Sequence, residues 1–176
     1  GNKRLDDLFT KYGKETVMAC IAQIFDETDI KCRNVISQLK DGEYEAASFF
    51  DDDGVLAGER VPLHAKVTIK KGQMTIDLSK CSAERKAGVN SRSLAGARVA
   101  YKAITGPLDP VNEGSFRALD VIIPEGNIMM ARYPAPMANW SSIIPTVVDT
   151  IIKALAPAMP DKIPAAHHGL LGGAVV

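Results

Sequence analysis

The sequence predicts an α+β fold with an antiparallel sheet, and the period of its hydrophobic pattern carries this prediction. Apolar residues recur at helical spacing over residues 2–39, and again near 90–104 and 141–155, whereas they alternate with polar residues over 63–79. Helices come first, then strands, then a helix, a strand and a helix. This order differs from the regular strand–helix alternation that builds parallel sheets.

Two helices are expected at the start. Asn2 is suited to cap a short helix with one apolar stripe. The stripe consists of Leu5, Leu8, Phe9 and Tyr12. A long helix from about Lys14 to Leu39 follows, and its apolar face keeps the helical spacing. This face is formed by Val17, Ile21, Ile24, Thr28, Cys32, Val35 and Leu39. Gly42 suits the left-handed conformation that often ends a helix.

A β-hairpin is expected between residues 63 and 79, where apolar and polar residues alternate. Its apolar face contains Leu63, Ala65, Val67, Ile69, Met74, Ile76 and Leu78. Lys71-Gly72 forms the turn, and the alternation predicts that one face is buried. Glu43 to Phe50 is expected to add a strand, and Asp51 to Gly54 the turn after it.

Three further elements complete the predicted fold. They are a helix capped by Asn90 or Ser91 and running to Ile104, a buried strand at Leu119–Ile123, and a helix from Ser141 or Ser142 to Leu155. The small residues Ala95, Gly96 and Ala97 would let another element approach the first of these helices closely. Pro145 is tolerated because it lies in the first turn of the last helix.

Charge and composition exclude several partners. The chain of 176 residues holds 21 basic and 21 acidic residues, so it lacks the basic surface typical of nucleic-acid binding. Its apolar runs are far shorter than the ~20 residues of a membrane helix. We therefore expect neither a nucleic acid nor a membrane as partner. The odd, widely spaced cysteines Cys20, Cys32 and Cys81 predict reduced thiols in a cytoplasmic protein.

Four residues are candidates for catalysis. Glu113 would act as a general base, and Asn112 would orient a substrate amide or carboxylate. The alternative is a turn, in which Asn112 bonds its own backbone and Gly114 takes a positive φ. His167 and His168 follow two alanines and precede a glycine, and neutral imidazoles suit acid–base work and metal binding. However, adjacent residues of an extended segment point to opposite faces, so a packing or solvated role is the alternative.

Other patterns carry no chemistry that we recognise. Asp51 to Gly54 lacks the alternating ligands of a calcium loop and is expected to be a solvated turn. Cys81 has no evident histidine partner, so we do not expect a nucleophile there. No phosphate-binding loop pattern occurs. The chain is therefore expected to hold neither a cofactor nor a metal.

The segment from Gly106 to Asn139 is the most informative part of the chain. Its five prolines and three glycines fix a specific path, and rigidly held loops often carry function. Three stretches in it, Asp109–Arg117, Val121–Gly126 and Ala131–Pro136, resemble the hydantoinase B/oxoprolinase family. Further resemblances, in the same order, are Asp41–Glu45, Asp51–Gly54, Thr75–Ser79 and Asn90. The resemblance covers nearly the whole chain.

Two departures from the family pattern restrict which residue roles of the family can be expected in this chain. Ser115 stands where the family commonly has a cysteine, so a thiol role at this position is excluded. Before the last helix, the family's glycine-asparagine-x-glutamate-threonine appears here as Ala-Asn-Trp-Ser-Ser over residues 138–142. A role for that glutamate and threonine is therefore not expected in this chain.

The resemblance implies a domain of the B subunit of an ATP-dependent cyclic-amide hydrolase that opens 5-oxoproline or a hydantoin. It also implies a partner, a hydantoinase A-type subunit that uses ATP and Mg, and a divalent metal elsewhere in B. The same subunit type in an ATP-dependent ketone carboxylase is one alternative. A structural or interface domain without catalytic groups is another.

Family members are considerably longer than this chain. The apolar run after Gly169 is typical of a strand that continues. We therefore expect residues 1–176 to form a single α+β domain, internal to a longer B subunit and inactive in isolation.

Overall fold

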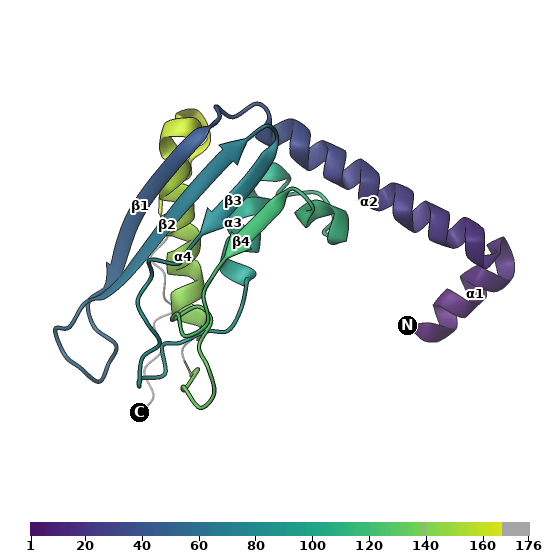
Figure 1. The fold of residues 1–176 in the computed structure, drawn as a ribbon. Helices are drawn as coiled ribbons and strands as arrows, with labels where there is room; N and C mark the ends of the chain where they lie inside the picture. Colours follow the sequence, from purple (N-terminus) through teal and green to yellow (C-terminus); the bar gives the residue numbers. More distant parts are fainter. Residues whose placement is uncertain (139, 167–176) are drawn as a thin grey trace.

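The computed structural model describes residues 1–138 and 140–166, and these form an α+β fold (Figure 1). Its sheet has the strand order β1-β2-β3-β4. The strands are β1 (Gly42–Phe50), β2 (Val61–Lys70), β3 (Gln73–Asp77) and β4 (Leu119–Ile122). β1–β2 and β2–β3 are antiparallel, whereas β3–β4 is parallel. The predicted sheet is thus confirmed, with one parallel pair that arises because a long connection containing a helix separates β3 from β4.

The predicted hairpin is confirmed in its register and its turn. Lys70 pairs with Gln73 across β2 and β3. Lys71 and Gly72 between them have φ values of 50° and 75°. Two consecutive left-handed residues are typical of the tight turn that matches the twist of a hairpin.

Two helices, α3 (Ala95–Thr105) and α4 (Trp140–Leu155), pack against each other, and α4 packs on β1 and β2. Figure 1 shows them behind the sheet. A Cβ atom on Gly96 would lie 3.1 Å from Val147 Cγ1, so the predicted close approach is confirmed. The largest fully buried side chains include Ile36, Leu63, Ile69, Met74, Ile76, Tyr101, Ile143, Ile151 and Leu155.

The N-terminal helices α1 (Asn2–Tyr12) and α2 (Lys14–Ile36) extend away from the sheet (Figure 1). Only Cys32 and Ile36 of α2 are buried, and no residue of α1 is. The stripe predicted on these helices therefore reaches the core only at its C-terminal end, because the sheet lies beside the last turns of α2. We call residues 2–24 the arm.

Several predicted helix boundaries need correction. α2 ends at Ile36 instead of Leu39, and Gly42, expected in a left-handed conformation, begins β1 without a positive φ. Gly1, and not Asn2, occupies the N-cap of α1, without a side-chain bond. Neither Asn90 nor Ser91 caps α3, which begins at Ala95, whose N–H donates to Ser93 Oγ at 3.0 Å. No helix of the described residues is long and apolar enough to cross a membrane.

Candidate functional site

The segment rich in proline and glycine that begins at Gly106 contributes to two separate parts of the structure. Residues 106–117 run along α2 and contain the 3-10 helix η1 (Glu113–Phe116). Residues 124–138 lie at one end of the sheet, beside the loops that follow β1 and β3. The rigid segment thus contributes to two separate loop clusters.

Asn112 is held by hydrogen bonds on both sides. Its Nδ2 donates to Thr28 Oγ1 of α2 at 2.9 Å, and its backbone N–H donates to Ser115 Oγ at 3.2 Å. Ser115 is fully buried, so the residue that replaces the family's cysteine stabilises the turn. Asn112 Oδ1 is also buried; the Asn112 side chain faces the N–H of Ser115 in the capping box that opens η1, but Oδ1 forms no well-aligned hydrogen bond in the described residues.

Gly114 lies directly against the backbone of α2. A Cβ atom at this position would lie 2.1 Å from the carbonyl oxygen of Phe25. Its φ is not among the positive ones, so the expectation of a left-handed turn at Gly114 is wrong. The glycine is required instead because two backbones approach each other closely.

A cleft of about 190 Å³ opens beside Asn112, between α2 and the loop that follows α3. It is lined by Ile24, Glu27, Thr28, Lys31, Cys32, Lys102, Asp109, Pro110 and Asn112. A Cβ atom on Gly106 would meet both Asp109 Oδ2 and Lys102 Nζ, so this glycine leaves room for both charged groups. The cleft combines ammonium groups, carboxylates and the amide side chain of Asn112, which suits a small polar ligand with donors and acceptors.

Two of the four candidate catalytic residues lie in the loop beside this cleft. Asn112 lines the cleft, whereas the side chain of Glu113 is exposed and forms no ion pair in the part of the chain that the structure describes. His167 and His168 lie outside the described residues. Their catalytic roles stay predictions.

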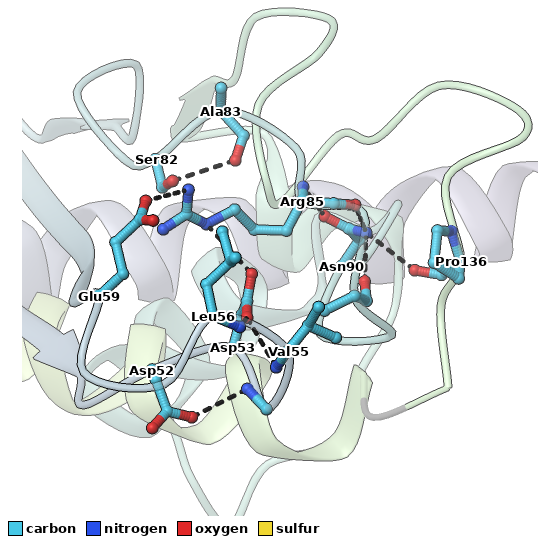
Figure 2. A network of polar contacts seen from close by, with 12 residues as sticks. Asp52, Asp53, Val55, Leu56, Glu59, Ser82, Ala83, Arg85, Asn90 and Pro136 are labelled. Carbon is cyan, nitrogen blue, oxygen red and sulfur yellow. Dashed lines mark hydrogen bonds and ion pairs between the residues drawn. The ribbon is translucent and has the colours of Figure 1, made fainter.

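The second cluster is centred on Asn90 (Figure 2). Its Nδ2 donates to the carbonyl oxygens of Arg85, Ala87 and Pro136, at 2.8, 3.0 and 2.8 Å. Its Oδ1 accepts from the N–H of Arg85 at 2.7 Å. Asn90 is fully buried, so its amide joins the loop after β3 to residues 131–136. Sequence reasoning missed this role because an asparagine before a helix is also a good cap.

The turn after β1 belongs to the same cluster. Asp53 is only 7% exposed, so the expectation of a fully solvated turn is wrong for this residue. The backbone N–H groups of Leu56 and Val55 donate to its Oδ1 and hold the pKa of the carboxyl below its usual 3.8. Arg85 Nε lies 3.8 Å from Asp53 Oδ2, as Figure 2 indicates.

Two arginine–glutamate pairs tie the loops together at the surface. Arg92 donates to both carboxylate oxygens of Glu125, at 2.8 and 2.7 Å. Arg132 binds Glu84 through its side chain and its backbone N–H, which lowers the pKa of Glu84. Exposed pairs contribute little stability, so we assign them a role in setting loop positions.

Cys81 is buried, and its thiol donates to the carbonyl oxygen of His64 at 3.2 Å. Burial raises the pKa of the thiol, which disfavours the nucleophilic thiolate. The nearby imidazole of His64 contacts Glu45 instead, 3.1 Å away. The geometry agrees with the expectation that Cys81 is not a nucleophile.

Replacing Asp53 by asparagine should destabilise the fold at neutral pH and have a smaller effect in acid. A carboxyl whose pKa is lower in the folded state stabilises the fold above its unfolded pKa, and this contribution is lost as the pH falls through the folded value. Urea unfolding of Asp53→Asn and the unsubstituted chain, at about pH 7 and about pH 3, measures the difference. Equal differences at both pH values would exclude this role.

The described residues thus form an α+β domain with a polar cleft beside α2 and two anchored loop clusters. The chain belongs to the hydantoinase B/oxoprolinase family, whose match covers residues 1–176.

Relatives and solved structures agree with this family. The chain is 27% identical over 178 residues to the B chain of a putative D-/L-hydantoinase from a Pseudomonas species, and 28% over 170 residues to the beta chain of caprolactamase from Pseudomonas jessenii. Each comparison covers 94% of this chain but only 30% and 29% of the relative. The chain therefore spans about 30% of the length of these relatives.

The crystal structure of ATP-dependent caprolactamase from Pseudomonas jessenii has the same fold. It matches with a TM-score of 0.83 and 27% identity, over 91% of this chain and 28% of that one. A nucleotide-free acetone carboxylase structure matches with a TM-score of 0.77, over 93% and 24% of the two chains. At 12% identity, this second likeness shows the fold alone.

Proposed function

We propose that this chain is an internal domain of the B subunit of a cytoplasmic, ATP-dependent cyclic-amide hydrolase. The observation that carries the proposal is the match to the caprolactamase structure. The name of that enzyme describes an ATP-dependent hydrolase of a lactam. The hydantoinase relative supports the same substrate class. The substrate is a small cyclic amide such as 5-oxoproline or a hydantoin.

The chemistry explains why such an enzyme would have two parts. A lactam carbonyl is stabilised by resonance and is a poor electrophile. Transfer of a phosphoryl group from ATP to the carbonyl oxygen makes the carbonyl carbon more electrophilic. Water then adds to this carbon, and the C–N bond breaks as the nitrogen takes up a proton. The resulting acyl phosphate is hydrolysed by a second water to the carboxylate and phosphate. The intermediate must be kept from random water, so an enclosed site shared by two subunits suits the reaction.

The ATP-using step belongs to a hydantoinase A-type subunit in this proposal, with Mg bound there. Among the described residues, no group of three or more histidine, cysteine, aspartate or glutamate side chains is placed to hold a metal ion. In this proposal, any divalent ion of the B subunit is held outside the described residues of this chain. The domain's own contribution is the cleft wall lined by Asn112, Lys102 and Asp109, against which a small cyclic amide would bind.

A substrate panel tests this function. The complete A–B complex is assayed for ADP formation with 5-oxoproline, a hydantoin and acetophenone, each with and without bicarbonate. We expect ADP formation with a cyclic amide, independent of bicarbonate. A requirement for a ketone plus bicarbonate would overturn the hydrolase proposal in favour of a carboxylase.

A further inference from the structure

The arm carries an apolar surface that nothing else in the described residues covers. Eight large apolar side chains lie on its 23 positions, and none of them is buried. They are Leu5, Leu8, Phe9, Tyr12, Val17, Met18, Ile21 and Ile24. Leu8, Tyr12 and Ile24 are 45%, 52% and 53% exposed. Exposed apolar side chains gathered on one part of a molecule mark an interaction site.

The helix α1 also lacks internal support. It has 11 residues, no side-chain cap bond and no buried residue. Isolated helices shorter than about 12–15 residues are marginal in water. A helix of this length therefore needs a surface against which its apolar stripe packs.

The exposed surface continues the face that packs on the domain core. Ile21 and Phe25 lie at helical spacing from Cys32 and Ile36, which are buried against the sheet side of the molecule. The face of α2 that is buried at Cys32 and Ile36 thus continues along the helix into the arm, where it is exposed. A partner seated on the arm would extend the core of this domain along the same helix.

The length of related chains indicates what covers the arm. The caprolactamase chain shares this fold over 91% of the present chain, yet the match spans 28% of that chain. At most 9% of the present chain, about 16 residues, is unmatched, so part of the 23-residue arm has a counterpart there. The larger part of that chain lies outside the match and would supply a packing partner in the same molecule.

The shape of the arm argues against a second copy as the partner. Gly13, at φ 82°, separates α1 from α2, and Figure 1 shows α1 turning back from the far end of α2. Pairing of two long helices needs a continuous apolar seam. The bent surface instead suits a globular partner that sits between the two helices.

We propose that the apolar surface of the arm docks onto the remainder of a B-type subunit, which presents a complementary apolar surface to it. This inference rests on the proposed function, since it takes the chain to be part of such a subunit. Hydrogen exchange tests it without reference to turnover, so a complex that fails in the substrate panel would still report on the docking.

The experiment compares amide exchange of residues 2–24 in the complete B subunit that contains this sequence and in the 176-residue chain. We expect strong protection in the complete subunit only. Leu8→Lys in the complete subunit should speed exchange by about tenfold or more, because it places a charge in the docked surface. Thr10→Lys, which adds the same charge to an exposed polar position of α1, should leave exchange unchanged.

Two results would overturn the inference. One is fast exchange of the arm in the unsubstituted B subunit. This includes the case in which the arm becomes protected only after the A subunit is added, because the partner would then be the A subunit. The other is protection of the isolated chain that grows with its concentration and coincides with a dimer mass, because the partner would then be a second copy.

Discussion

Replacing Gly114 by alanine is expected to lower the free energy of unfolding by about 2–4 kcal/mol, since the added methyl group has no space. Its carbon would lie 2.1 Å from the carbonyl oxygen of Phe25 and 2.7 Å from the Cα atom of the same residue. Both are backbone atoms of α2 and cannot rotate away. The loop must therefore separate from the helix, which also moves Asn112 away from Thr28.

Urea unfolding followed by circular dichroism measures this effect. Val111→Ala is the matched control, because Val111 lies in the same loop and is 63% exposed. Its effect should stay within about 0.5 kcal/mol, as is usual for surface substitutions. If Gly114→Ala unfolds at the same urea concentration as the unsubstituted chain, the close backbone contact does not exist in solution.

Much of the fold follows from periodicity alone. The alternation over residues 63–79 predicts the hairpin, its turn and its buried face, because only a strand places every second residue on one side. The helical spacing likewise predicts α2, α3 and α4. The ends of these helices were less predictable, since Asn2 suits a cap but is the first residue of α1, and Asn90 suits a cap but joins two loops.

The parallel pairing of β4 with β3 could not be predicted from the strand itself. Leu119–Ile123 is a short apolar run, and such a run fits either edge and either direction of a sheet. Its place depends on the path of the chain through α3. The pattern on the arm has the same limit: it shows an apolar stripe but not the surface that covers it.

The candidate site was predictable as a set of motifs but not as a geometry. The turn at Asp51–Gly54 and the residues 131–136 are far apart in sequence, and the Asp53–Arg85 and Asn90–Pro136 contacts bring them into one cluster. Gly114 was expected to supply a left-handed turn, whereas its role depends on Phe25, a residue 89 positions earlier. Long-range contacts of this kind leave no periodic signal.

Replacing Asn112 by alanine in the complete A–B complex should reduce kcat/KM for the cyclic amide about tenfold or more. Asn112 lines the cleft, and its bond to Thr28 holds this wall against α2; loss of one buried hydrogen bond costs about 1–2 kcal/mol. Glu113→Gln should also slow ring opening if this carboxylate is the general base. Val111→Ala serves again as the control, because its side chain does not line the cleft.

The most direct measurement is therefore ring opening and ADP formation, followed together in complexes that carry Asn112→Ala, Glu113→Gln or Val111→Ala. We predict that ATP-coupled ring opening slows in the first two, about tenfold or more for Asn112→Ala, while the third keeps the unsubstituted rate, with the same fold by circular dichroism in all three. Unchanged coupled turnover in both the Asn112 and the Glu113 variants would contradict a catalytic role of this loop and leave the domain with a structural one.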